Sequence, residues 1–378
     1  MFEMLGPDVI REGRATDAYF ERTVETLEAA ERNPPVVLEV TADKFPTGKW
    51  DLFTGVKDAV HLLEGLPIDV DALAEGRLFD GGPVMRITGR YLDFAPYETA
   101  LLGFLSHATG FATRALEARL AAPETTLASF GTRHVHPALA PVVERSALLA
   151  GFDGFSNVAA GDVLDREPTG TMPHALIICF GRGNQEAAWQ AFDDAVDESV
   201  PRVALCDTFT DEVDEVVRAV DTLEDRLASV RIDTTGSRRG DFRSILREVR
   251  WELDARGRED VSILASGGID PPTIAALSDV VDGFGVGSYV TDADPLDFAI
   301  DVVELDGEPI SKRGKLSGVK EAYRSAAGEH LVARRDAPAP AGAEALLEPV
   351  IRNGEIVRSF ALEEAIELTR SDRAVFED

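Results

Sequence analysis

Apolar and polar positions follow a regular order through the middle of this chain. From about residue 126 to 290, short apolar runs alternate with stretches of helical spacing, which is the pattern of parallel strands joined by helices. The predicted strands lie at 127–130, 154–158, around 171, 203–206, 230–233, 262–265 and 283–286. The predicted helices lie at 137–150, 186–197, 211–227, 241–255 and 272–277. Seven strands in so short a span favour a closed or nearly closed α/β barrel over an open sheet.

The segments on either side of this repeat have other patterns. Before it, we predict helices at 16–30, 51–63 and 96–120 and strands at 36–42 and 83–91. After it come a tight turn at 305–309, a proline and alanine linker at 337–343, and a strand and helix between 355 and 368. We therefore expect an N-terminal domain (1–122), a barrel domain (123–300) and a C-terminal segment (301–378) that packs on the N-terminal domain.

Charge adds information about surroundings and partners. The formal net charge is −30, and six lysines stand against thirty-two arginines, with the acidic residues spread along all 378 positions. Such a surface indicates adaptation to high salt and excludes nucleic acid as a partner. No apolar stretch is long enough to cross a membrane and the start has no leader pattern, so we expect a soluble, cytoplasmic protein. Two cysteines are too few for a disulfide framework or a zinc knuckle.

Two glycine-rich turns follow the last two predicted strands. They read Ser266-Gly267-Gly268 and Gly285-Val286-Gly287-Ser288. In a barrel of parallel strands these turns lie at the same edge, where bare N–H groups and hydroxyls can bind a phosphate. Glycine is suited to such turns because it adopts positive φ and has no Cβ to obstruct an anion. The turns predict a phosphate site, with two tight turns and no ligand as the alternative.

Charged, hydroxyl and imidazole side chains follow the other strands at the same predicted end. The residues there are Phe130, Arg133, His134, His136, Thr171, His174 and Asp207. On the fifth strand, the two-residue alternation places Arg231 and Asp233 on one face, opposite Val230 and Ile232. A cation and a carboxylate at a barrel mouth predict a binding site, although a structural ion pair explains the same pattern. His134 and His136 could begin a zinc site, but no third ligand is spaced to complete it.

Six segments carry a family resemblance in one collinear order across residues 16–325. They are Ser129-Phe-Gly-Thr-Arg-His, Gly151-Phe-Asp-Gly-Phe-Ser, Gly170-Thr-Met-Pro-His, Arg231-Ile-Asp, Ala265-Ser-Gly-Gly-Ile and Gly283-Phe-Gly-Val-Gly-Ser. Together they resemble nicotinate phosphoribosyltransferase, particularly its archaeal branch. The resemblance implies the type II phosphoribosyltransferase fold, with a TIM-like α/β barrel beside an N-terminal α/β sandwich domain that the C-terminal segment completes. It also implies an ATP-coupled, ligase-type enzyme of NAD salvage, which makes nicotinate mononucleotide and pyrophosphate from nicotinate and phosphoribosyl pyrophosphate.

The same resemblance implies roles for individual residues. Tyr19 is similar to an aromatic residue that reaches nicotinate from the partner subunit of a homodimer, or of a higher homo-oligomer with a shared active site. Thr171 and Arg231 match positions that hold nicotinate, and His174 matches a histidine that ATP phosphorylates. Ser288 and its glycines match the phosphate site. The sequence departs from the family at Arg133-His134, where an arginine pair is commoner, and it lacks a four-cysteine knuckle near the C-terminus.

The chemistry of such a reaction suggests a metal. Departure of pyrophosphate calls for Mg²⁺, and Asp207 and Asp233, at the ends of successive strands, are the candidates to hold it directly or through water. Asp233 could equally stabilise positive charge on the ribose or orient Arg231. ATP would enter as a co-substrate.

Other functions remain open. Quinolinate phosphoribosyltransferase shares the fold, but it needs additional cations for a second carboxylate. A barrel that binds a phosphorylated metabolite without turning it over is an alternative of another class. Nicotinamide is disfavoured as the substrate because Arg231 would face a neutral amide. The absence of lysine between Lys57 and Lys312 excludes Schiff-base chemistry within the barrel.

Overall fold

A computed structural model describes residues 3–42, 50–358 and 360–377 of the chain. The chain divides into two compact units, Met1–Thr113 with Ala293–Asp378, and Arg114–Asp292. Before residue 114 the first unit contains α1 (Pro7–Arg11), α2 (Ala18–Ala29), β1 (Pro35–Ala42), β2 (Asp51–Leu52), α3 (Val56–Leu63), β3 (Asp69–Ala72), β4 (Leu78–Phe79), β5 (Pro83–Arg90) and the start of α4 (Glu98–Ala121). After residue 292 it contains β12 (Phe298–Leu305), β13 (Glu308–Pro309), β14 (Lys320–Arg324), β15 (His330–Arg334), β16 (Glu344–Ala345), β17 (Glu348–Arg352), β18 (Glu355–Ile356) and α14 (Leu362–Glu377).

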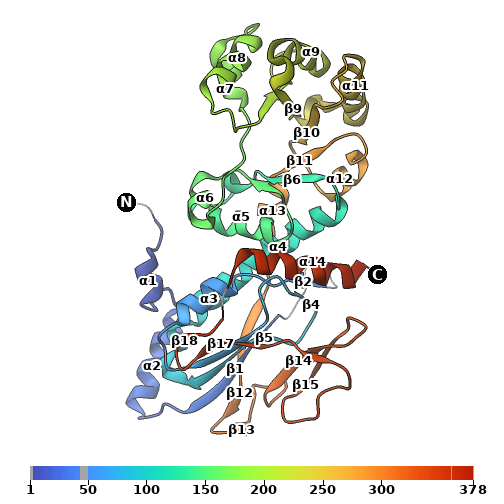
Figure 1. Cartoon of the computed structure of the whole chain (residues 1–378). Helices are drawn as coiled ribbons and strands as arrows, with labels where there is room; N and C mark the ends of the chain where they lie inside the picture. The colour runs from blue at the N-terminus through green and yellow to red at the C-terminus, as the bar shows by residue number, and fades with distance from the viewer. Residues whose placement is uncertain (1–2, 43–49, 359, 378) are drawn as a thin grey trace. The chain divides into compact units, whose positions relative to one another are not determined.

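A seven-stranded antiparallel sheet organises the first unit. Its strand order is β13-β12-β1-β5-β3-β17-β18, so two strands from the C-terminal part of the chain flank the three N-terminal strands on each side. Figure 1 shows this directly, with the blue strand β1 beside the orange strand β12. The Val-Val-Leu run of β1 suits a strand because branched side chains pack well on a pleated surface. One face of the sheet buries an apolar core that includes Val40, Val60, Met85 and Leu105.

Charged side chains also lie inside the first unit. Arg86 on β5 donates to Asp71 (3.1 Å) and to Glu321 (3.1 Å), and its side chain is only 1 % exposed. Lys320 on β14 pairs with Glu39 on β1 at 2.9 Å. We call these five residues the Arg86 network. Each buried charge has an opposite charge as its partner, as burial requires.

The second unit contains a parallel sheet. Its strands are β6 (Thr126–Ser129), β7 (Gly154–Phe155), β8 (Arg202–Leu205), β9 (Leu227–Ile232), β10 (Ser262–Ser266) and β11 (Gly283–Val286), in the order β7-β6-β11-β10-β9-β8. Its helices are α5 (Ala140–Leu149), α6 (Val158–Leu164), α7 (His174–Phe180), α8 (Gln185–Ala195), α9 (Glu212–Leu223), α10 (Gly236–Arg239), α11 (Phe242–Ala255), α12 (Pro271–Leu277) and α13 (Ser288–Thr291). Every strand pair is parallel, so all six carboxyl ends meet at one edge.

The prediction of a closed or nearly closed barrel is wrong. The sheet has six strands and is open between β7 and β8, because the strand predicted around Thr171 does not form. The segment Glu167-Pro-Thr-Gly-Thr-Met-Pro173 runs instead as irregular chain into α7. Two prolines without N–H donors and a glycine between them cannot sustain a central strand. The result is a half-barrel.

A second correction concerns the helix predicted at 51–63. The structure has the short strand β2 followed by α3, because Gly55 adopts a left-handed φ of 86° that ends any continuous helix. A Cβ at this position would lie 2.5 Å from the carbonyl oxygen of Phe104 on α4, so the close approach of the backbones requires glycine.

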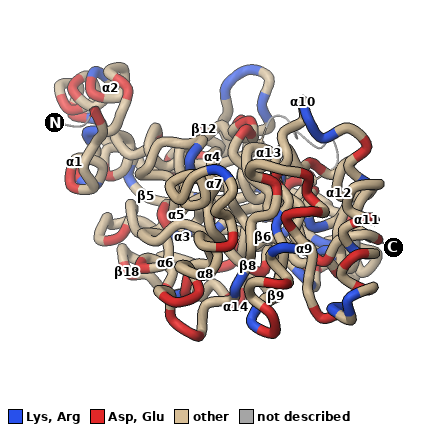
Figure 2. Tube along the Cα trace, turned by 90° about the horizontal axis from the view of Figure 1, so that it is seen from above, with Lys and Arg blue, Asp and Glu red and all other residues tan. Residues whose placement is uncertain are grey.

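Acidic residues occur throughout both units, and Figure 2 marks them in red at many places along the described Cα trace. Within the part of the chain that the structure describes, no helix combines the length and the apolar character needed to span a bilayer.

Candidate active site

A cavity of about 510 Å³ lies in the second unit, at the carboxyl ends of its strands. Residues that follow five of the six strands reach it. Its walls are formed by Phe130, Arg133, His134, Ser156, Gly170, Thr171, Arg231, Asp233, Ser266, Gly267, Gly268, Gly285, Gly287 and Ser288. Parallel pairing brings these residues together from positions as far apart in the chain as 130 and 288.

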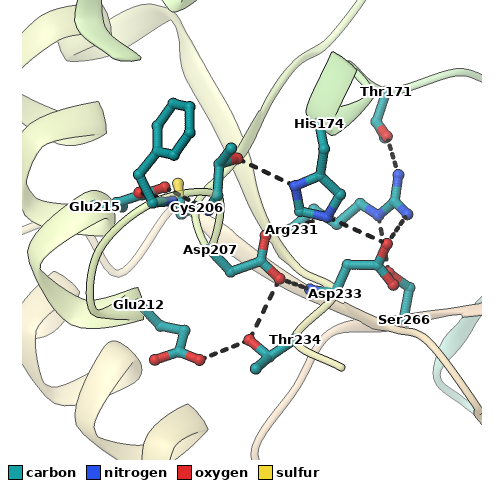
Figure 3. A network of polar contacts seen from close by, with 12 residues as sticks. Thr171, His174, Cys206, Asp207, Glu212, Glu215, Arg231, Asp233, Thr234 and Ser266 are labelled. Carbon is teal, nitrogen blue, oxygen red and sulfur yellow. Dashed lines mark hydrogen bonds and ion pairs between the residues drawn. The ribbon is translucent and has the colours of Figure 1, made fainter. Parts of the chain in front are cut away.

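Arg231 on β9 is held by side chains from three other segments (Figure 3). Its Nη1 donates to Thr171 Oγ1 at 2.7 Å, Nε donates to Ser266 Oγ at 2.8 Å, and Nη2 donates to Asp233 Oδ2 at 2.9 Å. The guanidinium also lies over the ring of Phe130, 5.2 Å from its centroid. These contacts fix a planar cation at the cavity wall, with its side chain still 16 % exposed.

Asp233 and Asp207 form a carboxylate pair behind this arginine. The backbone N–H of Asp233 donates to Asp207 Oδ2 at 2.6 Å, and Ser266 Oγ donates to Asp233 Oδ1 at 3.0 Å. Burial raises the pKa of Asp207 to about 6. Burial acts in the same direction on Asp233, but contacts with His174 and Arg231 outweigh it and lower the pKa of Asp233. Two neighbouring carboxylates therefore differ in their proton affinity.

His174, the first residue of α7, lies against both carboxylates. Its Nε2 is 3.7 Å from Asp207 Oδ1 and 3.7 Å from Asp233 Oδ2, while Nδ1 lies 3.1 Å from Thr208 Oγ1. The contact with Asp233 is the main cause that raises the pKa of His174, and burial opposes it. The imidazole thus ties the irregular segment before α7 to the ends of β8 and β9.

The first glycine turn has the positive φ that its sequence predicted, whereas Gly285 lies within β11 and Gly287 has a φ of −115°. Gly267 and Gly268 adopt φ of 83° and 64°. A Cβ on Gly267 would lie 2.7 Å from Asp233 Oδ1, and one on Gly285 would lie 2.4 Å from the ring of Phe130. No other residue type fits at these two positions without displacing a cavity wall.

Most of the residues singled out from the sequence surround this one cavity. Phe130, Arg133, His134, Thr171, Arg231, Asp233 and both glycine turns line it, and His174 and Asp207 adjoin it through Asp233. Tyr19 does not line it: this residue lies on α2 in the other unit and is 57 % exposed. His136 is also outside the lining, and its Nδ1 accepts a hydrogen bond from the N–H of Ala138.

Sequence reasoning missed the supports behind the cavity. Glu215 on α9 is fully buried and accepts the N–H groups of Thr208, Phe209 and Thr210, which fixes the chain after β8 (Figure 3). Thr234 donates to Glu212 at 2.6 Å beside Asp207. The available signal was the pair Asp-Thr after two successive strands, at 207–208 and 233–234, with Glu212 and Glu215 in the helix that follows the first pair.

The described residues include no group of three or more histidine, cysteine or acidic side chains placed to hold a metal ion. Asp207 Oδ1 is nevertheless buried and accepts no hydrogen bond within the described chain. A Mg²⁺ ion here would take most of its ligands from substrate phosphates and water, as Mg²⁺ commonly does, with Asp233 and Asp207 contributing charge.

Comparisons with known proteins add to this geometry. Two family models match, the quinolinate phosphoribosyl transferase N-terminal domain over residues 17–109 and the C-terminal domain over residues 111–301. The crystal structure of nicotinate-nucleotide pyrophosphorylase from Pyrococcus furiosus is 45 % identical, covers 100 % of this chain and 99 % of its own, and gives a TM-score of 0.95. A nicotinate phosphoribosyltransferase of Mycobacterium tuberculosis is 29 % identical over 95 % of this chain and 90 % of its own length. Human nicotinic acid phosphoribosyltransferase, at 22 % identity, 95 % and 94 % coverage and a TM-score of 0.76, shows a likeness of fold alone.

These matches correct the identification drawn from the six segments. The family models and the Pyrococcus structure overturn the assignment to nicotinate phosphoribosyltransferase. The expected ATP-coupled, ligase-type activity depended on that assignment and is also wrong. The phosphorylated His174 rested on that assignment alone. The expected fold class changes as well, to an N-terminal domain followed by a TIM-like half-barrel of parallel strands. The chain belongs to the quinolinate phosphoribosyl transferase family.

Proposed function

We propose that this chain is a quinolinate phosphoribosyltransferase, which converts quinolinate and phosphoribosyl pyrophosphate into nicotinate mononucleotide, pyrophosphate and CO₂. The observation that carries the proposal is the pairing of two guanidinium groups, Arg231 and Arg133, with two glycine turns around one cavity. The family models support the same reaction class.

The two arginines suit a pyridine with two carboxylates. A guanidinium has five N–H donors, and the three engaged by Thr171, Ser266 and Asp233 leave Arg231 able to bind a carboxylate as well. Arg133 is exposed at the cavity wall and makes no ion pair within the described part of the chain, so its charge is available for the second carboxylate. The ring of Phe130 offers an apolar surface to the pyridine.

The glycine turns suit the phosphorylated sugar. The turn at Gly267 and Gly268 and the turn at Gly285 to Ser288 both reach the cavity from adjacent strands. Their N–H groups and the Ser288 hydroxyl can bind phosphate oxygens without a side chain in between. The sugar would then lie between these turns and Arg231.

The reaction needs little proton chemistry from the protein in its first step. The pyridine nitrogen attacks the anomeric carbon of the ribose as the bond to pyrophosphate breaks, so orientation and stabilisation of the leaving group dominate. Asp233 at the cavity wall can stabilise positive charge that develops on the ribose. Mg²⁺ on the pyrophosphate would neutralise the leaving group, with Asp233 and Asp207 nearby. Loss of the carboxylate next to the ring nitrogen then releases CO₂, and a proton takes its place.

The test follows CO₂ and nucleotide together. The protein is incubated in molar KCl with phosphoribosyl pyrophosphate, Mg²⁺ and quinolinate labelled in the carboxylate adjacent to the nitrogen, and in parallel with nicotinate. We expect nicotinate mononucleotide and labelled CO₂ in equal amounts from quinolinate, without added ATP. Arg231→Ala, purified in the same way, serves as the control for contaminating host enzyme. Nucleotide formed from nicotinate and none from quinolinate would overturn the proposal, as would binding of phosphoribosyl pyrophosphate without any product.

A further inference from the structure

Arg239, the last residue of α10, lies behind the glycine turn without lining the cavity. Its Nη2 donates to the carbonyl oxygens of Ser266 (3.0 Å) and Gly267 (2.5 Å), and its Nε donates to the carbonyl oxygen of Thr234 (2.9 Å). One guanidinium therefore joins the turn after β10 to the chain that follows β9.

These bonds determine where the N–H groups of the turn point. In a trans peptide the carbonyl and the N–H of one unit point in opposite directions, and the described chain has no cis peptide. The carbonyl of Ser266 shares its peptide with the N–H of Gly267, and the carbonyl of Gly267 shares its peptide with the N–H of Gly268. Because both carbonyls face Arg239, both N–H groups face away from it.

Neither N–H is used elsewhere. The N–H groups of Gly267 and Gly268 donate no hydrogen bond within the described residues, and both glycines line the cavity. Two adjacent donors that point into a cavity form a concave anion site. The positive charge of Arg239 behind the carbonyls polarises the same two peptides and strengthens the donors.

Arg239 is itself anchored. Its guanidinium lies over the ring of Phe242, 4.1 Å from the centroid, and its backbone N–H donates to Thr235 at the start of α10. The side chain therefore has a defined position before any ligand binds, and the turn is preorganised by it.

We propose that Arg239 is a positioning residue for the phosphate of the sugar, which binds the N–H groups of Gly267 and Gly268. This inference rests on the proposed function, because that function supplies the phosphorylated sugar. Without Arg239, the two carbonyls lose their partner and the peptides can rotate, so the donors no longer converge on one anion.

The chain offers a matched control in Arg250 on α11. This arginine also donates to two backbone carbonyls, those of Val261 (2.8 Å) and Arg258 (2.9 Å). Val261 directly precedes β10, so Arg250 makes the same kind of contact at the opposite end of the strand. Removal of Arg239 costs three carbonyl hydrogen bonds, and removal of Arg250 costs two together with an ion pair to Asp254 at 2.7 Å, but only Arg239 is attached to the glycine turn.

The experiment measures ribose 5-phosphate and pyrophosphate binding to the full chain by titration calorimetry, in wild type, Arg239→Ala, Arg239→Lys and Arg250→Ala. We expect Arg239→Ala to weaken ribose 5-phosphate about tenfold, Arg239→Lys to give an intermediate loss, and Arg250→Ala to stay within about twofold of wild type. Pyrophosphate affinity should change by less than about twofold in all three. If Arg239→Ala does not fold, the lysine variant alone carries the comparison.

Equal losses in Arg239→Ala and Arg250→Ala would overturn the proposal, and so would a loss for pyrophosphate as large as that for ribose 5-phosphate. Absence of ribose 5-phosphate binding in wild type would overturn it too. None of these measurements contains a pyridine substrate, so failure of the enzyme to use quinolinate is a separate result that rejects the proposed function alone.

Discussion

Two arginines on sheet strands, Arg86 and Arg231, have opposite surroundings. Arg86 in the first unit and Arg231 in the second both pair with carboxylates on their own sheet, at 3.1 Å and 2.9 Å. Arg86 is 1 % exposed and its partners enclose it, whereas Arg231 is 16 % exposed and forms part of a cavity wall. An inward ion pair on a strand is therefore no sign of a site by itself. The glycine turns beside Arg231 make the difference, because they leave room for a ligand where side chains would fill it.

The largest effect is expected on stability, from Arg86→Ala. The change leaves Glu321 without this cation in a buried position, although Asp71 keeps its contact with Arg352. We expect the free energy of unfolding to fall by about 3–5 kcal/mol. Urea unfolding measures it, and kcat/KM for quinolinate, determined where both proteins are folded, should stay at the wild-type value. A loss of activity in the folded variant would contradict a purely structural role.

Arg231→Ala should reduce activity strongly and stability only weakly, the reverse of Arg86→Ala. We expect kcat/KM for quinolinate to fall on the order of 100-fold, because a fixed cation for one carboxylate is lost, with a smaller rise in KM for phosphoribosyl pyrophosphate. The melting temperature should fall less than in Arg86→Ala, because the site is partly open to water. Steady-state kinetics and thermal unfolding of both variants test this difference. Equal losses of stability in the two variants would contradict the distinction between a structural arginine and an arginine of the cavity.

A third ionisable group extends the comparison: Glu144 is a buried carboxylate that pairs with no arginine among the residues that the structure describes. Glu144 on α5 is fully buried below the cavity residue Ser156, whose N–H it accepts at 3.4 Å, and burial raises its pKa to about 7. The folded state therefore keeps a proton up to about pH 7 that the unfolded chain releases near pH 4.5. More protons are bound in the folded state within this window, so stability falls as pH rises through it.

We expect this contribution to be about 2 kcal/mol between pH 4.5 and 7, and Glu144→Gln should remove it. Urea unfolding of wild type and variant at several pH values across the window provides the measurement. A variant with the same slope of stability against pH as wild type would show that other groups cause that slope.

The salt dependence of stability distinguishes buried ion pairs from surface charges, and it is the smallest effect that we expect. Molar KCl should stabilise wild type, since it screens repulsion in a chain of net charge −30. The difference in unfolding free energy between wild type and Arg86→Ala should change by less than about 0.5 kcal/mol from 0.1 to 2 M KCl, because a buried pair is poorly screened. If the difference in unfolding free energy became much smaller at high salt, the Arg86 pair would behave as a solvent-exposed ion pair.

Much of the candidate site could be predicted from the sequence, because the carboxyl ends of parallel strands meet at one edge of the sheet. Once strands were predicted before Phe130, Asp207, Ser266 and Ser288, the convergence of these residues followed from the fold class. The strand predicted around Thr171 was wrong, since two prolines and a glycine outweigh its apolar residues. The support that Glu215 gives to the backbone at 208–210 could not be found, because it depends on how α9 lies against the sheet.

The identification failed for a chemical reason. The segments Arg231-Ile-Asp and Ala265-Ser-Gly-Gly-Ile line one cavity, and the guanidinium and glycine turn that they supply would suit a pyridine with one carboxylate as well as one with two. These segments therefore do not indicate how many carboxylates the pyridine carries. Under the proposed function, Arg133 would be the residue that distinguishes the two substrates.

The seven-stranded sheet has a consequence for synthesis on the ribosome. β3, completed at residue 72, pairs with β17, which begins at residue 348, and β1 pairs with β12. All strands of the half-barrel, between residues 114 and 292, are synthesised before β12 and β17. The second unit can therefore fold first, and the N-terminal strands keep an apolar face open to chaperones until β12 and β17 emerge.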